Sequence, residues 1–442
     1  MLILGGLVAT FDEQGTLWPD GAVKISGDRI VEVGPASELA ARYPSDERLD
    51  ATGSLVLPGL ICSHTHFYGA FARGLALKGE PPADFSQILE RLWWRLDRAL
   101  RPEDVQASAE VCLLDAIRYG TTTLFDHHAS PRFIEGALDI IAETTHNAGV
   151  RACLCYEVSD RDGRDLAVAG IRENARFIQR CQRQPDPRLA GMMGLHASLT
   201  LSDETLQMAV GSANELGVGC HLHVAEAKAD VADSLKRTGL RVVEHLYKAG
   251  ALNARALAAH CVHIDAYEID ILRQAGVRVA HNPRSNMNNA VGAAPIPRLL
   301  RDHITVGLGN DGFSNNMFNE MSVAYLLHKA AAGDPRVMPA DDVTRMAFRH
   351  NGRIASDIFG MPIGVLAAGA AADLVIVDYR PFTPVTPANL SSHIIFGVDG
   401  SQVRTTICAG RFLMRDRRIL SMDEEAVTAR ARELARKLWA RF

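Results

Sequence analysis

Several features that would assign the chain to a membrane or nucleic-acid class are missing from the sequence. None of its apolar runs reaches the ~20 residues that a membrane-spanning helix needs. The formal net charge of -5 provides no basic excess to attract nucleic acid or anionic lipid. Met1–Phe11 is apolar but lacks a basic start and a cleavage site, so it predicts a strand and not a signal peptide. We therefore expect a cytoplasmic protein that binds neither nucleic acid nor a membrane.

Cysteine is sparse and follows no pattern. The 442 residues include 8 cysteines, with no CxxC pair and no regular spacing. In a chain of this length, that distribution is typical of buried thiols in a reducing compartment and not of a disulfide framework. The hydrophobic share of 47% and the charged share of 22% are ordinary globular values. The length predicts two or three domains, or one large barrel with an appendage.

Both ends of the chain are rich in short strand-like runs separated by glycine-containing turns. This pattern predicts one small β-sandwich assembled from residues 1–57 and 365–442, with the amphipathic segment Glu424–Arg441 as a C-terminal helix. The strand-like runs are Leu2–Leu4, Ala22–Ile25, Ile30–Val33, Ala372–Val377 and Val403–Cys408.

The middle of the chain, residues 58–364, has a different rhythm, in which short apolar runs alternate with longer amphipathic stretches. Eight such repeats predict an α/β fold of the (β/α)8 TIM barrel type, with an open doubly wound sheet as the alternative. The runs, of which the first begins just before this segment, are Leu55–Ile61, Thr121–Phe125, Arg151–Cys155, Leu189–Leu195, Val218–Leu222, Ala256–Ala259, Val277–Ala280 and Ile304–Leu308.

Residues that can bind metal follow the ends of these runs with regularity. Strands of a parallel barrel all open their carboxyl ends on one face, so side chains far apart in sequence would meet there. In an open sheet they would be spread along a ridge, which is why we prefer the barrel. The residues are His64 and His66 after run one, His196 after run four, His223 and Glu226 after run five, His260 after run six and Asp311 after run eight.

The pair His64 and His66 has the spacing of a metal-binding strand. Residues two apart on a strand point to the same side, so both imidazoles can reach one ion. A further histidine and an aspartate would complete a nitrogen and oxygen donor set with one position left for water. Such a set suits one divalent ion, with Zn²⁺ preferred and Fe²⁺ also accepted. A single histidine on an apolar strand is usually a hydrogen-bonded core residue, but that explanation does not account for so many at corresponding positions.

Several of these segments resemble the amidohydrolase superfamily over essentially the whole chain. Segments on four strands and the loop His281–Asn286 match one branch of this superfamily. That branch contains the guanine, cytosine and adenosine-type deaminases and the triazine hydrolases. A closer similarity is to SsnA-type aminohydrolases, through Leu92–Asp97, Asp126–Ser130 and Phe313–Asn316. The strand segments are Pro58–His66, His221–Glu226, Ala259–His263 and Gly309–Gly312.

The resemblance implies a role for each of these residues. It makes His64, His66, His223 and Asp311 the metal ligands. Glu226 and His260, together with Asp311, become the catalytic residues, while His196 and Asn286 are expected near the substrate. The spacing to Glu226 favours His223 over His221 as the ligand, but His221 stays open as an alternative, as do the roles of His127, His128 and His263.

One absence bears on the number of ions. Two-metal members of this superfamily generally bridge their ions with a carboxylated lysine at the end of the fourth strand. The corresponding segment, Gly191–Ala197, contains no lysine. A single-metal site is therefore expected.

Glu226 and His260 favour deamination of an aminated N-heterocycle, purine- or pterin-like, with attack by hydroxide and release of ammonia. Protonation of a ring nitrogen by a glutamate turns an aromatic amidine into an electrophile, a step that amide hydrolysis needs less. The alternative is hydrolysis of a cyclic amide, ureide or carbon–halogen bond on the same site. A metal-binding accessory protein without turnover would not need Glu226 and His260. Enzymes of this kind are commonly homo-oligomers acting on small molecules, and we expect the same here.

Overall fold

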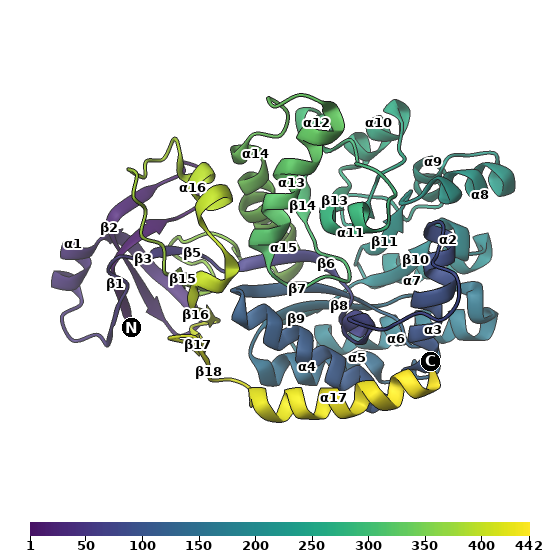
Figure 1. Cartoon of the computed structure of the whole chain (residues 1–442), viewed down its shortest axis with the longest axis horizontal. Helices are drawn as coiled ribbons and strands as arrows, with labels where there is room; N and C mark the ends of the chain where they lie inside the picture. The colour runs from purple at the N-terminus through teal and green to yellow at the C-terminus, as the bar shows by residue number, and fades with distance from the viewer.

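The computed structural model describes residues 1–442 and contains two β-rich bodies that lie side by side (Figure 1). The smaller body contains strands from both ends of the sequence. The larger body contains a ring of parallel strands surrounded by helices. The segment Glu424–Arg441 forms the helix that its amphipathic pattern predicted, α17, drawn in yellow, and this helix crosses over to the larger body.

The larger body is a closed parallel barrel. Its strands form two hydrogen-bonded sets, β6 to β9 and β10 to β14. Parallel bridges close the two seams, Val158 with Leu195 on one side and Thr65 with Asp311 on the other. The (β/α)8 prediction is therefore confirmed. The strands are β6 (Leu60–Thr65), β7 (Thr121–His128), β8 (Arg151–Tyr156), β9 (Leu189–Gly191), β10 (Met193–Ala197), β11 (Cys220–Val224), β12 (Leu257–His260), β13 (Arg278–His281) and β14 (Val306–Leu308), where β9 and β10 together correspond to the fourth predicted run.

The run Leu55–Ile61, predicted as the first barrel strand, is divided between the two bodies. β5 (Leu55–Pro58) pairs with strands of the smaller body, and the barrel strand β6 begins only at Leu60. Gly59 stands between them, where a Cβ would overlap the side chain of Thr122. Every residue on both sides of the break is buried, so hydrophobicity alone did not mark it.

The two chain ends combine in one continuous sheet, as predicted for the part of the protein that is assembled from both ends of the sequence. β5 pairs with β1 on one side and antiparallel with β15 on the other, which joins the N-terminal strands to the C-terminal ones. The domain limits at residues 57/58 and 364/365 remain our proposal. The sheet contains β1 (Leu2–Ala9), β2 (Leu17–Ser26), β3 (Arg29–Pro35), β4 (Arg48–Asp50), β15 (Leu374–Val377), β16 (Val403–Cys408), β17 (Arg411–Arg415) and β18 (Arg418–Ile419).

Helices cover the outside of the barrel and bury their apolar faces against its strands. None of the helices combines the length and hydropathy needed to cross a membrane. The helices of eight or more residues that precede α17 are α4 (Pro102–Arg118), α5 (Ala137–Ala148), α6 (Arg164–Arg183), α7 (Asp203–Glu215), α8 (Lys228–Thr238), α10 (Ala266–Ala275), α13 (Met317–Ala332), α15 (Asn351–Phe359) and α16 (Leu390–Gly397). The shorter ones are α1 (Ala36–Arg42), α2 (Phe85–Ile88), α3 (Trp94–Ala99), α9 (Val242–Lys248), α11 (Pro283–Asn288), α12 (Ile296–Arg301) and α14 (Ala340–Thr344).

The stretch between β6 and α4, residues 67–99, forms what we call the cap segment, which includes α2 and α3. An ion pair between Arg161 and Asp97 ties it to the barrel, with the two side chains only 7% and 1% exposed. The guanidinium of Arg161 also lies 5.5 Å from the ring of Trp94. Helix α17 supports the same segment, since Trp439 Nε1 donates to the carbonyl of Phe71 at 2.8 Å.

Candidate active site

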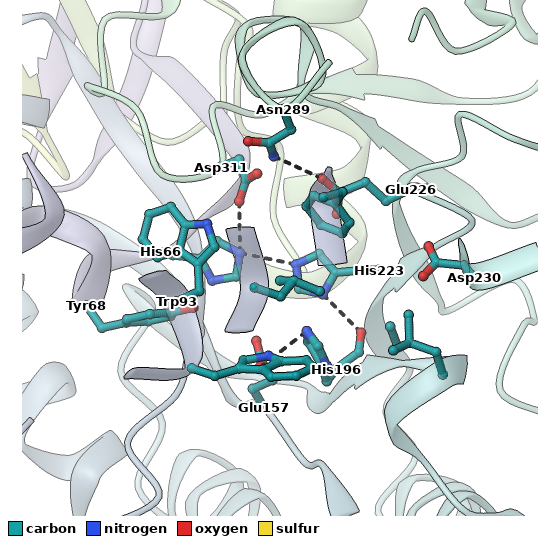
Figure 2. Close-up of a pocket in the computed structure, with 15 residues that line it drawn as sticks. His66, Tyr68, Trp93, Glu157, His196, His223, Glu226, Asp230, Asn289 and Asp311 are labelled. Carbon is teal, nitrogen blue, oxygen red and sulfur yellow. Dashed lines mark hydrogen bonds and ion pairs between the residues drawn. The ribbon is translucent and has the colours of Figure 1, made fainter. Parts of the chain in front are cut away.

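The residues predicted as metal ligands converge at the carboxyl ends of the barrel strands (Figure 2). His66 Nε2 lies 3.0 Å from Asp311 Oδ1 and 3.1 Å from His223 Nε2. His64 Nε2 lies 3.7 Å from Asp311 Oδ1. The ligand atoms of His64, His223, His260 and Asp311 all lie within 4.8 Å of one another. Segments that are up to 247 positions apart thus supply one compact group of donors.

The hydrogen bonds behind these imidazoles show how the rings are oriented. His66 Nδ1 donates to the carbonyl of His127 at 2.6 Å, and His223 Nδ1 donates to the carbonyl of His196 at 2.9 Å. A carbonyl only accepts, so in the neutral rings each Nε2 carries a lone pair. Two lone pairs 3.1 Å apart repel unless a cation, either a metal ion or a proton, lies between them. The Nε2 of His64 is buried without any hydrogen-bond partner. These residues therefore fit a divalent metal ion.

Backbone strain gathers around the same cluster. Asp311, His260 and Ala225 have φ angles of 57°, 71° and 47°, in the left-handed region that side chains disfavour. Such strain persists where the surrounding structure enforces it, and it is common at functional sites. The Ser285 hydroxyl donates to Asp311 Oδ2, which leaves Oδ1 directed at the imidazoles.

Glu226 and His260 lie beside this cluster. His260 Nε2 is 3.5 Å from Glu226 Oε2 and 3.9 Å from Asp311 Oδ2. Burial raises the pKa of Glu226 well above its ordinary value, and the charges of Asp311 and Asp230 add to this effect. A carboxyl group in this setting keeps its proton to a higher pH than an exposed one does. Burial lowers the pKa of His260, which favours its neutral form.

The two residues predicted to contact substrate have different positions. His196 lines the cavity at the end of β10, and its Nδ1 bonds to Thr200 Oγ1 at 2.6 Å. Asn286 does not line it. Its side chain is fully buried behind His260, whose Nδ1 donates to Asn286 Oδ1 at 2.8 Å. The expected substrate contact of Asn286 stays a prediction, while Asn289, one turn further along, lines the cavity. The sequence pattern located the loop but did not identify which of its asparagines faces inward.

The four histidines left open by the sequence lie outside the donor cluster. His221 Nε2 contacts His64 Nδ1 at 2.9 Å, so it supports a ligand from behind. His128 Nε2 bonds to Ser130 Oγ at 2.9 Å, and His263 Nε2 donates to the carbonyl of Val291 at 2.8 Å. His127 is fully buried and donates to main-chain carbonyls from its Nε2.

A second set of donor atoms lies next to the first. His66, His127, Glu157 and His223 also have ligand atoms within 4.8 Å of one another. Both ring nitrogens of His127, however, already contact oxygen atoms, with the Glu157 carboxylate on one side and two carbonyls on the other. His127 would have to give up these contacts to bind a second ion.

Sequence reasoning missed several polar residues of the site, among them Glu157, Ser285 and Asn289. Glu157 and Asn289 line the cavity, and Ser285 holds Asp311. The signal was available, because Glu157 directly follows the third barrel strand and the other two lie in the loop after the seventh. The cap segment supplies Tyr68, Phe85, Leu89, Trp93 and Trp94 to the same cavity.

A closed (β/α)8 barrel with three histidines and an aspartate at its catalytic end defines the class of barrel hydrolases. A model of the amidohydrolase family matches residues 55–413, and a model of the bacterial imidazolonepropionase-like composite domain matches residues 21–45. The chain therefore belongs to the amidohydrolase family, as its motifs predicted. The closer similarity to SsnA-type proteins stays a prediction.

Relatives of known activity match the chain from end to end. A 5-methylthioadenosine/S-adenosylhomocysteine deaminase of Pelotomaculum thermopropionicum is 33% identical, over 99% of this chain and 98% of the relative. A 5'-deoxyadenosine deaminase of Methanosarcina mazei is 34% identical, over 100% and 99%. These similarities confirm the prediction of a hydrolase that acts on carbon–nitrogen bonds.

Solved structures show the same architecture. A zinc-bound adenosine deaminase from Xanthomonas campestris has a TM-score of 0.88 and 26% identity, covering 99% of this chain and 98% of its own. A zinc-bound atrazine chlorohydrolase from Arthrobacter aurescens has a TM-score of 0.84 and 26% identity, covering 98% and 99%. The fold thus accommodates zinc, and it is used for both amine and halide leaving groups.

Proposed function

We propose that this protein is a metal-dependent deaminase that hydrolyses the amidine of a purine-like heterocycle and releases ammonia. The observation that carries this proposal is the position of Glu226, a buried carboxyl with a raised pKa, beside His260 and the imidazole cluster. A group that retains its proton in this position can protonate a ring nitrogen next to the carbon under attack. The deaminase relatives support the same reaction.

The ion in this proposal is held by His64, His66, His223 and Asp311. We propose a single ion, most simply Zn²⁺ with Fe²⁺ as the alternative, because the fourth strand offers no lysine and His127 is already bonded. When bound, such an ion lowers the pKa of a water ligand and makes hydroxide available near neutral pH.

The side chains around the ion divide the proton transfers among them. Asp311, held by Ser285, takes the proton from the attacking water, and Glu226 gives its proton to the ring nitrogen. His260 faces the attacking oxygen: its Nε2 accepts a hydrogen bond from the water and, once protonated, donates to the oxygen on the tetrahedral carbon. The amino group then receives the proton held by Asp311 and leaves as ammonia, while the hydroxyl on the same carbon returns a proton to Glu226 and becomes the carbonyl of the product. The aromatic residues of the cap segment exclude water and provide flat faces for a heterocycle.

Substrates of the relatives direct the choice of compound. Both named relatives act on nucleosides that contain an adenine ring. We therefore propose adenosine-like compounds first and pterins second. Hydrolysis of a carbon–halogen bond is the competing function, because the atrazine chlorohydrolase has the same fold.

The test is a parallel measurement of ammonia and chloride. The zinc-loaded protein is incubated with adenosine, 5'-deoxyadenosine, 5'-methylthioadenosine, adenine, guanine, pterin, cytosine and a chlorotriazine. Ammonia from a purine or pterin supports the proposal. Chloride without ammonia favours the competing function, and neither product contradicts both.

The first prediction concerns the proton donor. Glu226→Gln keeps the shape of the side chain but removes its acid group, so kcat should fall about 10²- to 10⁴-fold. Metal content by atomic emission and the melting temperature should be unchanged. Normal turnover by this variant would show that our proton-transfer assignment is wrong.

A further inference from the structure

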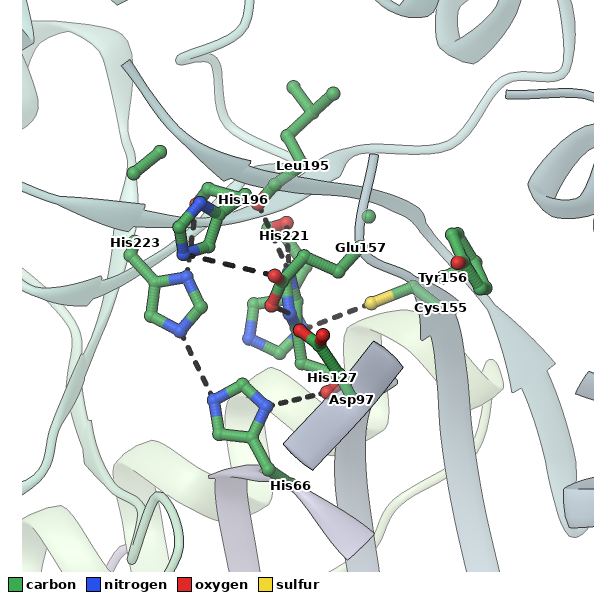
Figure 3. A network of polar contacts seen from close by, with 12 residues as sticks. His66, Asp97, His127, Cys155, Tyr156, Glu157, Leu195, His196, His221 and His223 are labelled. Atoms are coloured by element: carbon green, nitrogen blue, oxygen red, sulfur yellow. Dashed lines mark hydrogen bonds and ion pairs between the residues drawn. The ribbon is translucent and has the colours of Figure 1, made fainter. Parts of the chain in front are cut away.

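Glu157 is a buried carboxylate in the cavity that the deamination chemistry does not use. It follows β8, is 5% exposed and lines the cavity together with His196 (Figure 3). In the view of Figure 2 it lies on the other side of the His66–His223 pair from Glu226. A buried carboxylate costs free energy unless its oxygens are satisfied, so the partners of each oxygen matter.

One oxygen of Glu157 is occupied by the protein. Oε2 lies 3.2 Å from His127 Nδ1. The other ring nitrogen, His127 Nε2, lies 3.1 Å from the carbonyls of Leu195 and of His221, on β10 and β11. These contacts fix the imidazole between three strands of the barrel. The carboxylate is thereby held in one orientation.

The second oxygen of Glu157 has no hydrogen-bond partner in the protein. Oε1 lies 3.8 Å from His196 Nε2, which is beyond hydrogen-bond distance. Burial by itself favours the neutral acid, but His196, His127 and Arg161 together lower the pKa of Glu157 below its ordinary range. Oε1 is therefore a charged acceptor directed at the cavity.

His196 lies beside this oxygen and lines the same cavity. The Thr200 hydroxyl donates to the carbonyl of Ala197 at 3.1 Å, so it accepts the hydrogen of His196 Nδ1. The Nε2 atom of His196 is thereby the free ring nitrogen next to Glu157 Oε1. The free oxygen of Glu157 is the acceptor that this part of the cavity presents.

We propose that Glu157, which lies beside His196, determines substrate specificity by accepting hydrogen bonds from N–H or O–H donors of the heterocyclic substrate. The turnover of such a substrate rests on the proposed function, whereas its recognition through hydrogen bonds does not. A ring N–H of a free base and a ribose hydroxyl of a nucleoside offer the same donor chemistry. A ligand with a lone pair or a carboxylate at this position would instead be repelled.

The experiment compares ligand pairs that differ only in the donor. Adenine and 9-methyladenine test the ring N–H, while adenosine and 2',3'-dideoxyadenosine test the ribose hydroxyls. The zinc-loaded wild-type protein and Glu157→Gln are measured for kcat/KM and for quenching of tryptophan fluorescence, since Trp93 and Trp94 line the cavity. The exposed Glu135→Gln provides the matched control.

For one pair, the wild-type protein should prefer the member with the donor, and Glu157→Gln should reduce that preference about 10- to 100-fold, mainly through KM. The pair that responds shows whether the protein recognises the ring N–H or the ribose hydroxyls. Equal losses of kcat/KM for both members of a pair would mean that Glu157 only positions His127. No loss for either member would mean that Glu157 does not recognise the substrate. Either result overturns the proposal, as would loss of a bound ion from the variant.

Two further measurements keep the outcomes separable. If Glu157→Gln does not fold, Glu157→Asp retains the charge beside His127 but withdraws the free oxygen from the cavity, and it should show the same selective loss. If the wild-type protein releases no ammonia from any compound, the proposed function fails. Fluorescence quenching by the same ligand pairs then still decides whether Glu157 recognises donors.

Discussion

The terminal sheet and the catalytic end of the barrel bury opposite kinds of side chains. The core of the sheet is aliphatic, with Ile3, Val23 and Ile376 almost completely excluded from solvent. The catalytic end of the barrel buries a group of imidazoles, with His64 and His260 as completely enclosed as those aliphatic residues. Aliphatic burial stabilises a fold directly, whereas buried imidazoles and carboxylates need a partner for every polar atom. The difference separates a region built for stability from one built for chemistry.

Asp311→Asn should have the largest effect on activity among the changes that test this comparison. The amide keeps the volume of the side chain but cannot take a proton from water, and it is a poorer ligand. We expect kcat to fall about 10⁴-fold. Steady-state ammonia release measures the loss, and thermal denaturation without metal should show little change. A large loss of stability would mean that the site also holds the barrel together.

Ser285→Ala should have a smaller effect at the same site. The hydroxyl fixes Asp311 Oδ2 without being a ligand itself, so its removal frees the carboxylate to rotate. Supporting residues of this kind typically contribute 10- to 100-fold to activity or metal affinity. Zinc titration of the metal-free protein and kcat measure both quantities. Ser86→Ala, on the cap segment, is the control.

Ile376→Ala should leave kcat unchanged and act only on stability. The side chain is fully buried in the terminal sheet, and its truncation leaves a cavity there. The free energy of unfolding should fall by about 2–5 kcal/mol. Urea denaturation measures that change. A loss of kcat in the folded variant would contradict the division of roles between the two regions.

Much of the barrel and the site could be predicted because both rest on simple periodic rules. The alternation of apolar runs and amphipathic stretches gave the eight strands. The rule that polar residues gather at carboxyl strand ends brought together His64, His223 and Asp311. Applied to the third strand as well, the same rule would have found Glu157.

Other features depend on three-dimensional detail that periodicity does not contain. The division of Leu55–Ile61 between two bodies was hidden because both halves are buried. Asn286 and Asn289 are close in sequence, yet one turn of helix decides which of them faces the cavity. The side chains of His260 and Asp311 are aimed by left-handed backbone angles, which a strand pattern does not predict.

Helix α17 gives the end of the sequence a direct connection to the cap segment. Trp439 bonds to the carbonyl of Phe71, Arg441 Nε donates to the carbonyl of Ala99 at 2.8 Å, and the carbonyl of Phe442 accepts from Arg95. Substitutions in this helix can therefore shift the aromatic wall of the cavity without altering any donor of the metal cluster. For protein engineering, α17 is a region outside the cavity where substitutions can change the substrate range without changing the catalytic groups.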